Sequence, residues 1–382
     1  MTTPRFLQIH TLHSYPAALL NRDDSGLAKR MPFGGVVRTR ISSQCLKRHW
    51  RVAQDEFALK NIDGFTDSMR TRNAVSLGVM QPLKEVHAAS VDVLQGIEAA
   101  LQENIYSESG TQPLLLGLPE VEYLQAKASS ICAEHPNDPR AARDAVNLLF
   151  STRRANEERD NFRAFREASR FPGGLISALF GRMVTSDPAA NMDAAVHVAH
   201  AFTVHGEERE MDFWAAVEDL PKEEEGPGAA HLNDMELTAG LFYGYVVVSN
   251  LEGCDAGEWE NADRDLAGKV VEHLTHLIAT VSPGAKLGST APYGFADLML
   301  IEAGSRQPRS LANAYREPAR ARIEAATEKL AGHLGKLDAA YGGKEVRRVM
   351  SVEDCDIPSA ERLCLDDLAT WAADAARSGA AV

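Results

Sequence analysis

Short segments in which apolar and polar residues alternate occur at five places along the chain. This pattern is typical of β-strands that bury one of their two sides. It predicts strands at 5–13, 36–41, 195–205, 237–249 and 296–301. Within the second of these segments, Arg38 and Arg40 face one side of the strand, and the three residues between and beside them face the other.

Apolar residues that recur every three or four positions predict helices, and the clearest of these spans 44–59. Its buried face contains Leu46 and Trp50, and Ser42 and Ser43 are residue types that cap a helix N-terminus. A second face of the same helix carries three cations at close helical spacing, Lys47, Arg48 and Arg51. Further helices are predicted at 83–101, 140–150 and 259–281, and in an Ala-rich stretch from 318.

Two long stretches interrupt this series of strands and helices. Residues 64–174 are polar and helical, which indicates an insertion with its own small core. Residues 206–234 separate two predicted strands by far more than the roughly 2–5 residues of a hairpin loop. They carry ten acidic residues against two basic ones, and we expect them to form a projecting arm. The order of elements is compatible with an elaborated ferredoxin-like α+β core.

The charge is distributed unevenly along the 382 residues. The net charge is −14, which by itself argues against binding to nucleic acid. Residues 22–51, however, contain eight Lys or Arg against two Asp, a local balance of +6, so the rest of the chain carries −20. An acidic protein with one concentrated basic segment differs from a generally basic, non-specific binder.

The scattered cysteines and the lack of long apolar runs indicate a protein of a reducing compartment. The five cysteines are scattered and form no CxxC pair, so they predict neither a zinc ribbon nor a disulfide framework. No run of about 18 apolar residues is present, and the first residues lack the long apolar stretch of a signal peptide. We therefore expect a cytoplasmic protein.

Motifs of the common enzyme classes are missing from the sequence. There is no GxxxxGK[ST] loop, no GxGxxG, no GxSxG and no HExxH. Three HxxH spacings occur, and only that of His273 and His276 falls on a predicted helix, where both rings could share a face. With no further ligand motif beside it, we predict no metal site and no cofactor.

The basic segment is the most specific chemical feature. A strand that carries Arg38 and Arg40 leads through Ser42, Ser43 and Gln44 into the helix whose first turns carry three cations. Because a helix N-terminus favours phosphate through its unpaired N–H groups and its dipole, this arrangement could cradle a nucleic-acid backbone. The alternative is a solvated amphipathic face with no ligand.

At these residues the sequence resembles the CasC family, the repeated backbone subunit of the type I-E CRISPR surveillance complex, Cascade. The resemblance extends over both ends and the middle of the chain and is weakest at about 64–174. The matching motifs are IH at 9–10, LNRDD at 20–24, FGG at 33–35, RISSQCLKR at 40–48, GRM at 181–183, AHA at 199–201, AHL at 230–232, VSPGAK at 281–286 and SLANA at 310–314.

The resemblance implies a hand-shaped α+β molecule. Its modified RNA-recognition-motif (ferredoxin-like) palm would comprise 1–63, 176–205 and 235–382. A helical fingers insertion would occupy 64–175, and a β-hairpin thumb would occupy 206–234.

The resemblance also implies which residues contact the guide RNA. Lys47, Arg48 and Arg51 resemble the family's backbone contacts on its first helix. Met183 resembles a palm residue beside a displaced nucleotide, and Phe213 and Trp214 stand where the family's thumb carries a Trp-Phe pair in the opposite order. Further expected contacts are Asn21, Arg22, Lys29, Arg38, Arg40, Ser42, Gln44 and Lys286.

The implied function is a non-catalytic, RNA-binding one in antiviral defence. Several copies would stack into a helical filament along the CRISPR guide RNA (crRNA), together with the other Cascade subunits, as a ribonucleoprotein. The guide would then pair with target DNA in short segments, and a separate nuclease would cut the DNA. Two alternatives remain open, a guide-RNA-processing ribonuclease and a protein-only scaffold that uses its basic helix for an acidic partner.

Overall fold

The computed structural model describes residues 4–86, 89–106, 113–150, 162, 165–166, 169, 173–183, 191–217, 229–249 and 261–378. The chain divides into two compact units, which we call the sheet unit (Met1–Ile62 and Val196–Val382) and the helical unit (Asp63–Ala195). The observed division differs from the predicted one at 176–195, which belongs to the helical unit. Both units mix helices with antiparallel strands, so the predicted α+β class is confirmed.

The sheet unit is built on a mostly antiparallel sheet, which contains ten strands within the described residues. Its order is β12-β11-β10-β1-β9-β7-β3-β2, and β6 and β8 also pair with β9; of the strand pairs in the described ranges, only β11 and β12 are parallel. The strands are β1 (Phe6–Ala18), β2 (Arg30–Phe33), β3 (Val36–Ile41), β6 (Val196–Val198), β7 (Ala201–Thr203), β8 (Glu208–Val217), β9 (Ala229–Val248), β10 (Ala296–Gly304), β11 (Val346–Ser351) and β12 (Ala360–Arg362).

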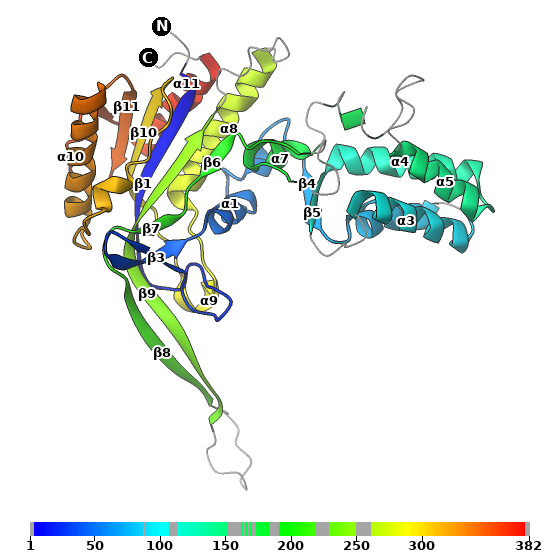
Figure 1. Ribbon diagram of the computed structural model, residues 1–382, viewed down its shortest axis with the longest axis horizontal. Helices are drawn as coiled ribbons and strands as arrows, with labels where there is room; N and C mark the ends of the chain where they lie inside the picture. The colour runs from blue at the N-terminus through cyan, green and yellow to red at the C-terminus, as the bar shows by residue number, and fades with distance from the viewer. Residues whose placement is uncertain are drawn as a thin grey trace. The chain divides into compact units, whose positions relative to one another are not determined.

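Helices cover both faces of this sheet (Figure 1). On one face, η5 (Ala312–Tyr315) and α10 (Ile323–Tyr341) bury Leu330 and Leu334 against Leu12 and Leu298. On the other face lie α1 (Ser43–Arg51) and α8 (Asn261–Thr280), and α11 (Leu365–Ser378) packs against α8. The short helices η1 (Leu59–Asn61) and α9 (Leu287–Thr290) complete the unit. Central strand β1 is therefore buried on both sides along its first half.

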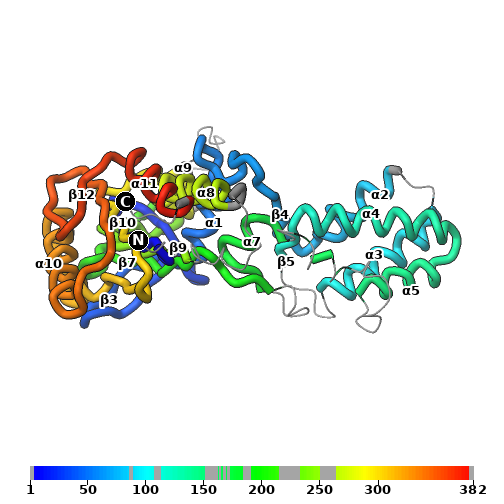
Figure 2. Tube along the Cα trace, turned by 90° about the horizontal axis from the view of Figure 1, so that it is seen from above, coloured from blue at the N-terminus to red at the C-terminus, as the bar shows by residue number. Residues whose placement is uncertain are grey.

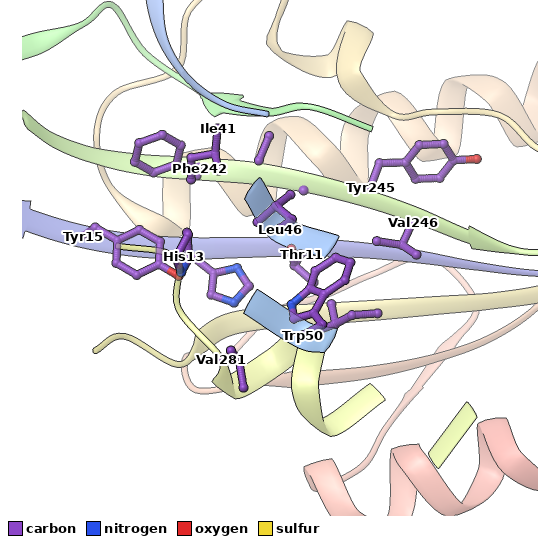
Figure 3. A pocket seen from close by; sticks show the side chains of 14 residues that line it. Thr11, His13, Tyr15, Ile41, Leu46, Trp50, Phe242, Tyr245, Val246 and Val281 are labelled. Carbon is purple, nitrogen blue, oxygen red and sulfur yellow. The ribbon is translucent and has the colours of Figure 1, made fainter. Parts of the chain in front are cut away.

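A small cavity lies between the sheet and α1, and Figure 3 shows its lining, with His13 and Trp50 among the labelled side chains. Its volume of about 30 Å³ has room for one or two water molecules and not for a nucleotide. The interior of the sheet unit at this place is thus packed core, and a polymeric ligand has to bind at the surface.

The helical unit has its own core. A two-stranded sheet begins it, and three long helices lie along one another (Figure 2), burying Val79, Ile97 and Leu124 between them. Glu120 is buried, and its carboxylate accepts hydrogen bonds from Arg182 (2.7 Å) and Arg166 (2.6 Å). The elements are β4 (Ser68–Thr71), η2 (Val75–Met80), α2 (Gln81–Val86), α3 (Val91–Tyr106), β5 (Leu114–Gly117), α4 (Leu118–Glu134), α5 (Pro139–Leu149) and α7 (Gly174–Phe180).

The predicted strands agree with the structure more closely than the predicted helix at 44–59. Strand β3 has the expected bounds, and the strand predicted at 195–205 is split in two where Ala199 donates its N–H to Tyr245 O (2.9 Å). Helix α1 ends at Arg51 with Val52 as its C-cap, and Phe57, which was predicted to lie on the buried face of this helix, instead stacks on His276 of α8 with ring centroids 3.6 Å apart. Strands β11 and β12 lie in the tail that was predicted to be helical.

Among the helices of the described residues, none has the length and apolar character needed to cross a membrane.

Candidate nucleic-acid interface

The loop that follows β1 is held in one conformation by hydrogen bonds to the Asp23 side chain and between backbone groups. Asp23 Oδ1 accepts hydrogen bonds from the N–H groups of Ser25 (2.9 Å) and Leu27 (3.1 Å), which is an Asx-type turn. The N–H of Lys29 donates to Asn21 O (2.9 Å), and Lys29 O accepts from the N–H of Arg40 (2.8 Å). Residues at both ends of this loop therefore lie beside the end of β3.

Helix α1 starts directly against the same loop. Ser42 is its N-cap: its Oγ accepts from the Cys45 N–H (3.3 Å), and its own N–H donates to Asn21 Oδ1 (2.9 Å). Trp50 anchors the inner face in the core. The outer face carries a polar stripe at positions i, i+3, i+4 and i+7, formed by Gln44, Lys47, Arg48 and Arg51.

A third segment, 281–287, is hydrogen-bonded to α1 and to the start of the loop that follows β1. His49 donates from Nδ1 to Cys45 O (2.8 Å) and accepts at Nε2 from the Gly284 N–H (3.4 Å), which requires the Nδ1–H tautomer. The N–H of Ala285 donates to Leu19 O (2.9 Å). These bonds bring Lys286 to the side of α1 that faces the first loop.

The charges in these segments act on one another. Burial lowers the pKa of His200, and the positive charges of Arg40 and Lys29 lower it further. The Arg40 guanidinium donates to His200 Nδ1 at 2.7 Å. Burial raises the pKa of the Cys45 thiol to about 11, against the opposing influence of Arg48 and Lys29. Lys29 therefore lies within electrostatic reach of both α1 and the end of β3.

Seven cations from these segments form what we call the basic surface. They are Arg22, Lys29, Arg40, Lys47, Arg48, Arg51 and Lys286. Burial lowers the pKa of Lys47, which is half-buried. Within the described residues, the side chains of Lys29, Arg48 and Lys286 have no carboxylate partner. The structure thus brings together most of the predicted contacts, with Asn21, Ser42 and Gln44 among them.

Arg38 requires a correction. The predicted alternation along β3 is right, but the side chain that was expected to meet a phosphate is fully buried. Its guanidinium donates to the carbonyl oxygens of Phe33 (3.1 Å), Thr203 (3.0 Å) and Tyr315 (2.9 Å). Helix η5, which comes from the far end of the chain, covers this face of the strand. Arg38 therefore ties three segments together and is not part of the basic surface.

The remaining predicted contacts lie elsewhere. Phe213 and Trp214 are 66% and 39% exposed on β8, opposite Asp234 and Asn233 of β9, and as neighbours on a strand they point to opposite sides of the ribbon. Figure 1 shows β8 and β9 continuing beyond the sheet; residues 218–228 between them lie outside the described residues. Met183 is 79% exposed and belongs to the helical unit.

Sequence reasoning missed the residues that position the basic surface. The sequence interpretation assigned no role to His49 or His200, and no local spacing relates them to Gly284 or Arg40. Of the HxxH pairs, His273 donates from Nδ1 to Phe57 O (2.9 Å), and His276 stacks on Phe57. No group of three His, Cys, Asp or Glu that could hold a metal ion occurs within the described part of the chain.

Comparison with solved structures gives two similar chains. One belongs to a "CRISPR RNA-guided surveillance complex, pre-nicking", with 26% identity and a TM-score of 0.74 over 96% of this chain and 100% of that one. The other, from a "CRISPR RNA-guided surveillance complex", has 22% identity and a TM-score of 0.56 over 96% and 99%, which supports the fold alone. The curated proteins gave no match.

The sequence profile of one family, described as CT1975-like protein, matches residues 7–371, nearly the whole chain. Together with the first structural match, this confirms the resemblance to a Cascade-type backbone protein, without deciding the subtype. The chain belongs to the CT1975-like protein family.

Proposed function

We propose that the chain is a non-catalytic RNA-binding subunit of a cytoplasmic type I-E Cascade complex. In this proposal, copies of it oligomerise along the CRISPR guide RNA, grip the backbone and present bases to target DNA in antiviral defence. The observation that carries the proposal is the basic surface, where three separate chain segments place seven cations around helix α1, with Arg48 and Arg51 in its last turn.

The chemistry of this surface suits a phosphate backbone. Lys and Arg contact phosphates without reading sequence, and a subunit that serves any guide must leave the base edges to Watson–Crick pairing. The N-terminus of α1 adds backbone N–H groups and a favourable dipole at the end of the helix opposite to Arg48 and Arg51. The acidic remainder of the chain concentrates this attraction on one site.

The opposite face of the sheet is unsuited to stacking bases. In an RNA-recognition motif, aromatic residues on the central strands stack on bases. Here the aromatic Tyr243 and Tyr245 of β9 lie on that face, but the Tyr243 hydroxyl accepts from the Leu311 N–H (3.0 Å) and the ring packs beside Tyr315. The chain therefore covers its own aromatic face. This supports a modified palm that binds RNA on the α1 side.

Two exposed groups support contacts with displaced bases. Phe213 and Trp214 on the hairpin offer aromatic rings, and Met183 offers an apolar side chain. Stacking of this kind accepts any base and contributes roughly 1–3 kcal/mol per base. We assign the hairpin to a thumb and the helical unit to fingers on this basis. The matched chain of a CRISPR RNA-guided surveillance complex supports a role for this chain in a complex of that kind.

The proposal is tested by producing the chain with a guide RNA and its complex partners, and by extracting nucleic acid from the purified assembly. We expect guide-length RNA and several copies of the chain for each RNA. Assembly without RNA would favour the protein-only scaffold. Purified chain should also leave a repeat-containing RNA intact, whereas cleavage without partners would establish the ribonuclease alternative.

A further inference from the structure

One carboxylate lies where the hairpin leaves the sheet and contacts the first loop and the hairpin at once. Glu236 of β9 is buried, and both of its oxygens are engaged. Oε2 accepts from the Ala28 N–H at 2.6 Å, and Oε1 accepts from the guanidinium groups of Arg30 and Arg209, the latter at 3.2 Å. Arg209 belongs to β8, so Glu236 joins the loop and both strands of the hairpin.

Further contacts hold the first loop to the base of the β8–β9 hairpin, and we call this contact region around Glu236 the joint. Arg30 donates from Nε to Glu207 at 2.5 Å; burial alone would lower the pKa of Arg30, but its bonds with Glu207 and Glu236 raise it. Next to Glu236, Met235 is buried with Leu19 and Ala28 of the loop. The loop is therefore docked on the base of the hairpin by charge and by apolar contact together.

We infer that Glu236 is a positioning residue that fixes the hairpin relative to the basic surface. Ala28, which Glu236 binds, directly precedes Lys29, whose backbone is bonded to Asn21 and Arg40. On the hairpin side, Glu236 stands opposite Met211, and Phe213 lies two residues, about 7 Å, farther along the strand.

The consequence for RNA is a constant spacing between two contacts. Under the proposed function, on which this inference rests, the backbone grip and the hairpin contact meet the guide a fixed number of nucleotides apart. A buried carboxylate with two guanidinium partners suits this role, because it resists displacement more strongly than a neutral hydrogen bond does.

The test uses guide RNA assembled with the full-length chain and probed with dimethyl sulfate, which methylates accessible bases. Wild-type chain should give a pattern of reactivity that repeats along the guide. Glu236→Gln keeps the size of the side chain and an acceptor for Ala28 but removes the charge that holds both arginines. We expect the ratio of reactivity between the most and least reactive positions to fall about threefold. The RNA concentration at half-saturation should change less than about twofold, because no cation of the basic surface is altered.

Glu210→Gln is the matched control, since Glu210 is an exposed carboxylate on the same hairpin, and it should leave the pattern as in wild type. Arg209→Gln weakens the joint from its exposed side and should reduce the ratio of reactivity in the same direction even if Glu236→Gln fails to fold. A pattern as sharp as wild type in folded Glu236→Gln or, failing that, in Arg209→Gln overturns the positioning role. A wild-type complex with no repeating pattern would instead overturn the proposed function itself.

Discussion

Two groups of charged side chains in the sheet unit, one around Glu302 and the other around α1, differ in whether the chain itself supplies partners of opposite charge. Beneath α10, Glu302 accepts hydrogen bonds from Arg309 (2.7 and 3.0 Å) and Arg347 (2.8 Å), and pairs with His10 at 3.2 Å. Arg347 also donates to both oxygens of Asp338 (2.5 and 2.7 Å). Around α1, by contrast, Lys29, Arg48 and Lys286 of the basic surface have no carboxylate partner among the residues that the structure describes.

The difference shows that the number of charged residues in a segment does not reveal whether they bind a ligand. Whether each charge has a partner of opposite sign within the chain is more informative. Buried charges cost several kcal/mol each unless they are paired and hydrogen-bonded, and the group around Glu302 meets this requirement within the chain. Clustered cations at a surface repel one another and gain from an external anion. We therefore interpret the first group as a structural network and the second as a binding surface.

The largest expected effect is on the structural network. Arg347→Ala removes the guanidinium that buried Glu302 shares with half-buried Asp338, and the free energy of unfolding should fall by about 3–5 kcal/mol in urea titrations. Arg362→Ala is a matched control, because its partner Asp354 is fully exposed, and it should cost less than about 1 kcal/mol. Equal costs for both variants would contradict the distinction between the two kinds of site.

The two arginines of β3 allow the comparison to be made on one strand. Arg38→Ala removes three hydrogen bonds to buried carbonyls and should lower the free energy of unfolding by about 2–4 kcal/mol. Arg40→Ala should leave it within about 1 kcal/mol and weaken RNA binding. Unfolding in urea and RNA titration of the folded variants measure both. A stable Arg38→Ala that loses RNA affinity would restore Arg38 to the basic surface.

Local sequence patterns predicted the strand and helix that carry the basic residues, but they did not predict which of these residues is buried. The alternation in β3 and the spacing of Lys47, Arg48 and Arg51 follow from the geometry of single elements, and both are present in the structure. The burial of Arg38 depends on Tyr315, 277 residues away along the chain, and no local pattern encodes that contact.

The missed elements have a similar explanation. Strand β11 begins Val-Arg-Arg-Val, and its inward Arg347 is buried through ion pairs, so apolar alternation does not show it. Lys286 is held beside α1 by the hydrogen bond between His49 and Gly284, which are 235 residues apart.

The assignments of Met183, Phe213 and Trp214 to guide contacts rest on the resemblance and remain predictions.

Acid should act on the structural network. Burial lowers the pKa of His10 in the folded protein, whereas an unfolded histidine titrates near 6.5. Between pH 7 and 5 the unfolded chain therefore binds a proton that the folded chain excludes, and the free energy of unfolding falls with pH. Glu302, whose folded pKa is depressed, contributes its own loss only below about pH 4.5.

His10→Gln should reduce the fall between pH 7 and 5 by about 1 kcal/mol relative to wild type, as measured by urea unfolding at both pH values. Lys336→Gln, a change on the exposed side of α10, serves as a control and should follow the wild-type dependence. An unchanged dependence in His10→Gln would show that His10 does not exclude the proton.

A small effect in free energy tests the central claim most directly. RNA affinity is measured over a range of salt concentrations for wild type and for Lys47→Ala, Arg48→Ala and Arg51→Ala, with two guides of unrelated sequence. We predict a loss of affinity of about 3–10-fold, equal for both guides, and a salt slope that decreases by about 1 for each cation removed. A loss that depends on the guide sequence, or an unchanged slope, would contradict a backbone grip by the basic surface.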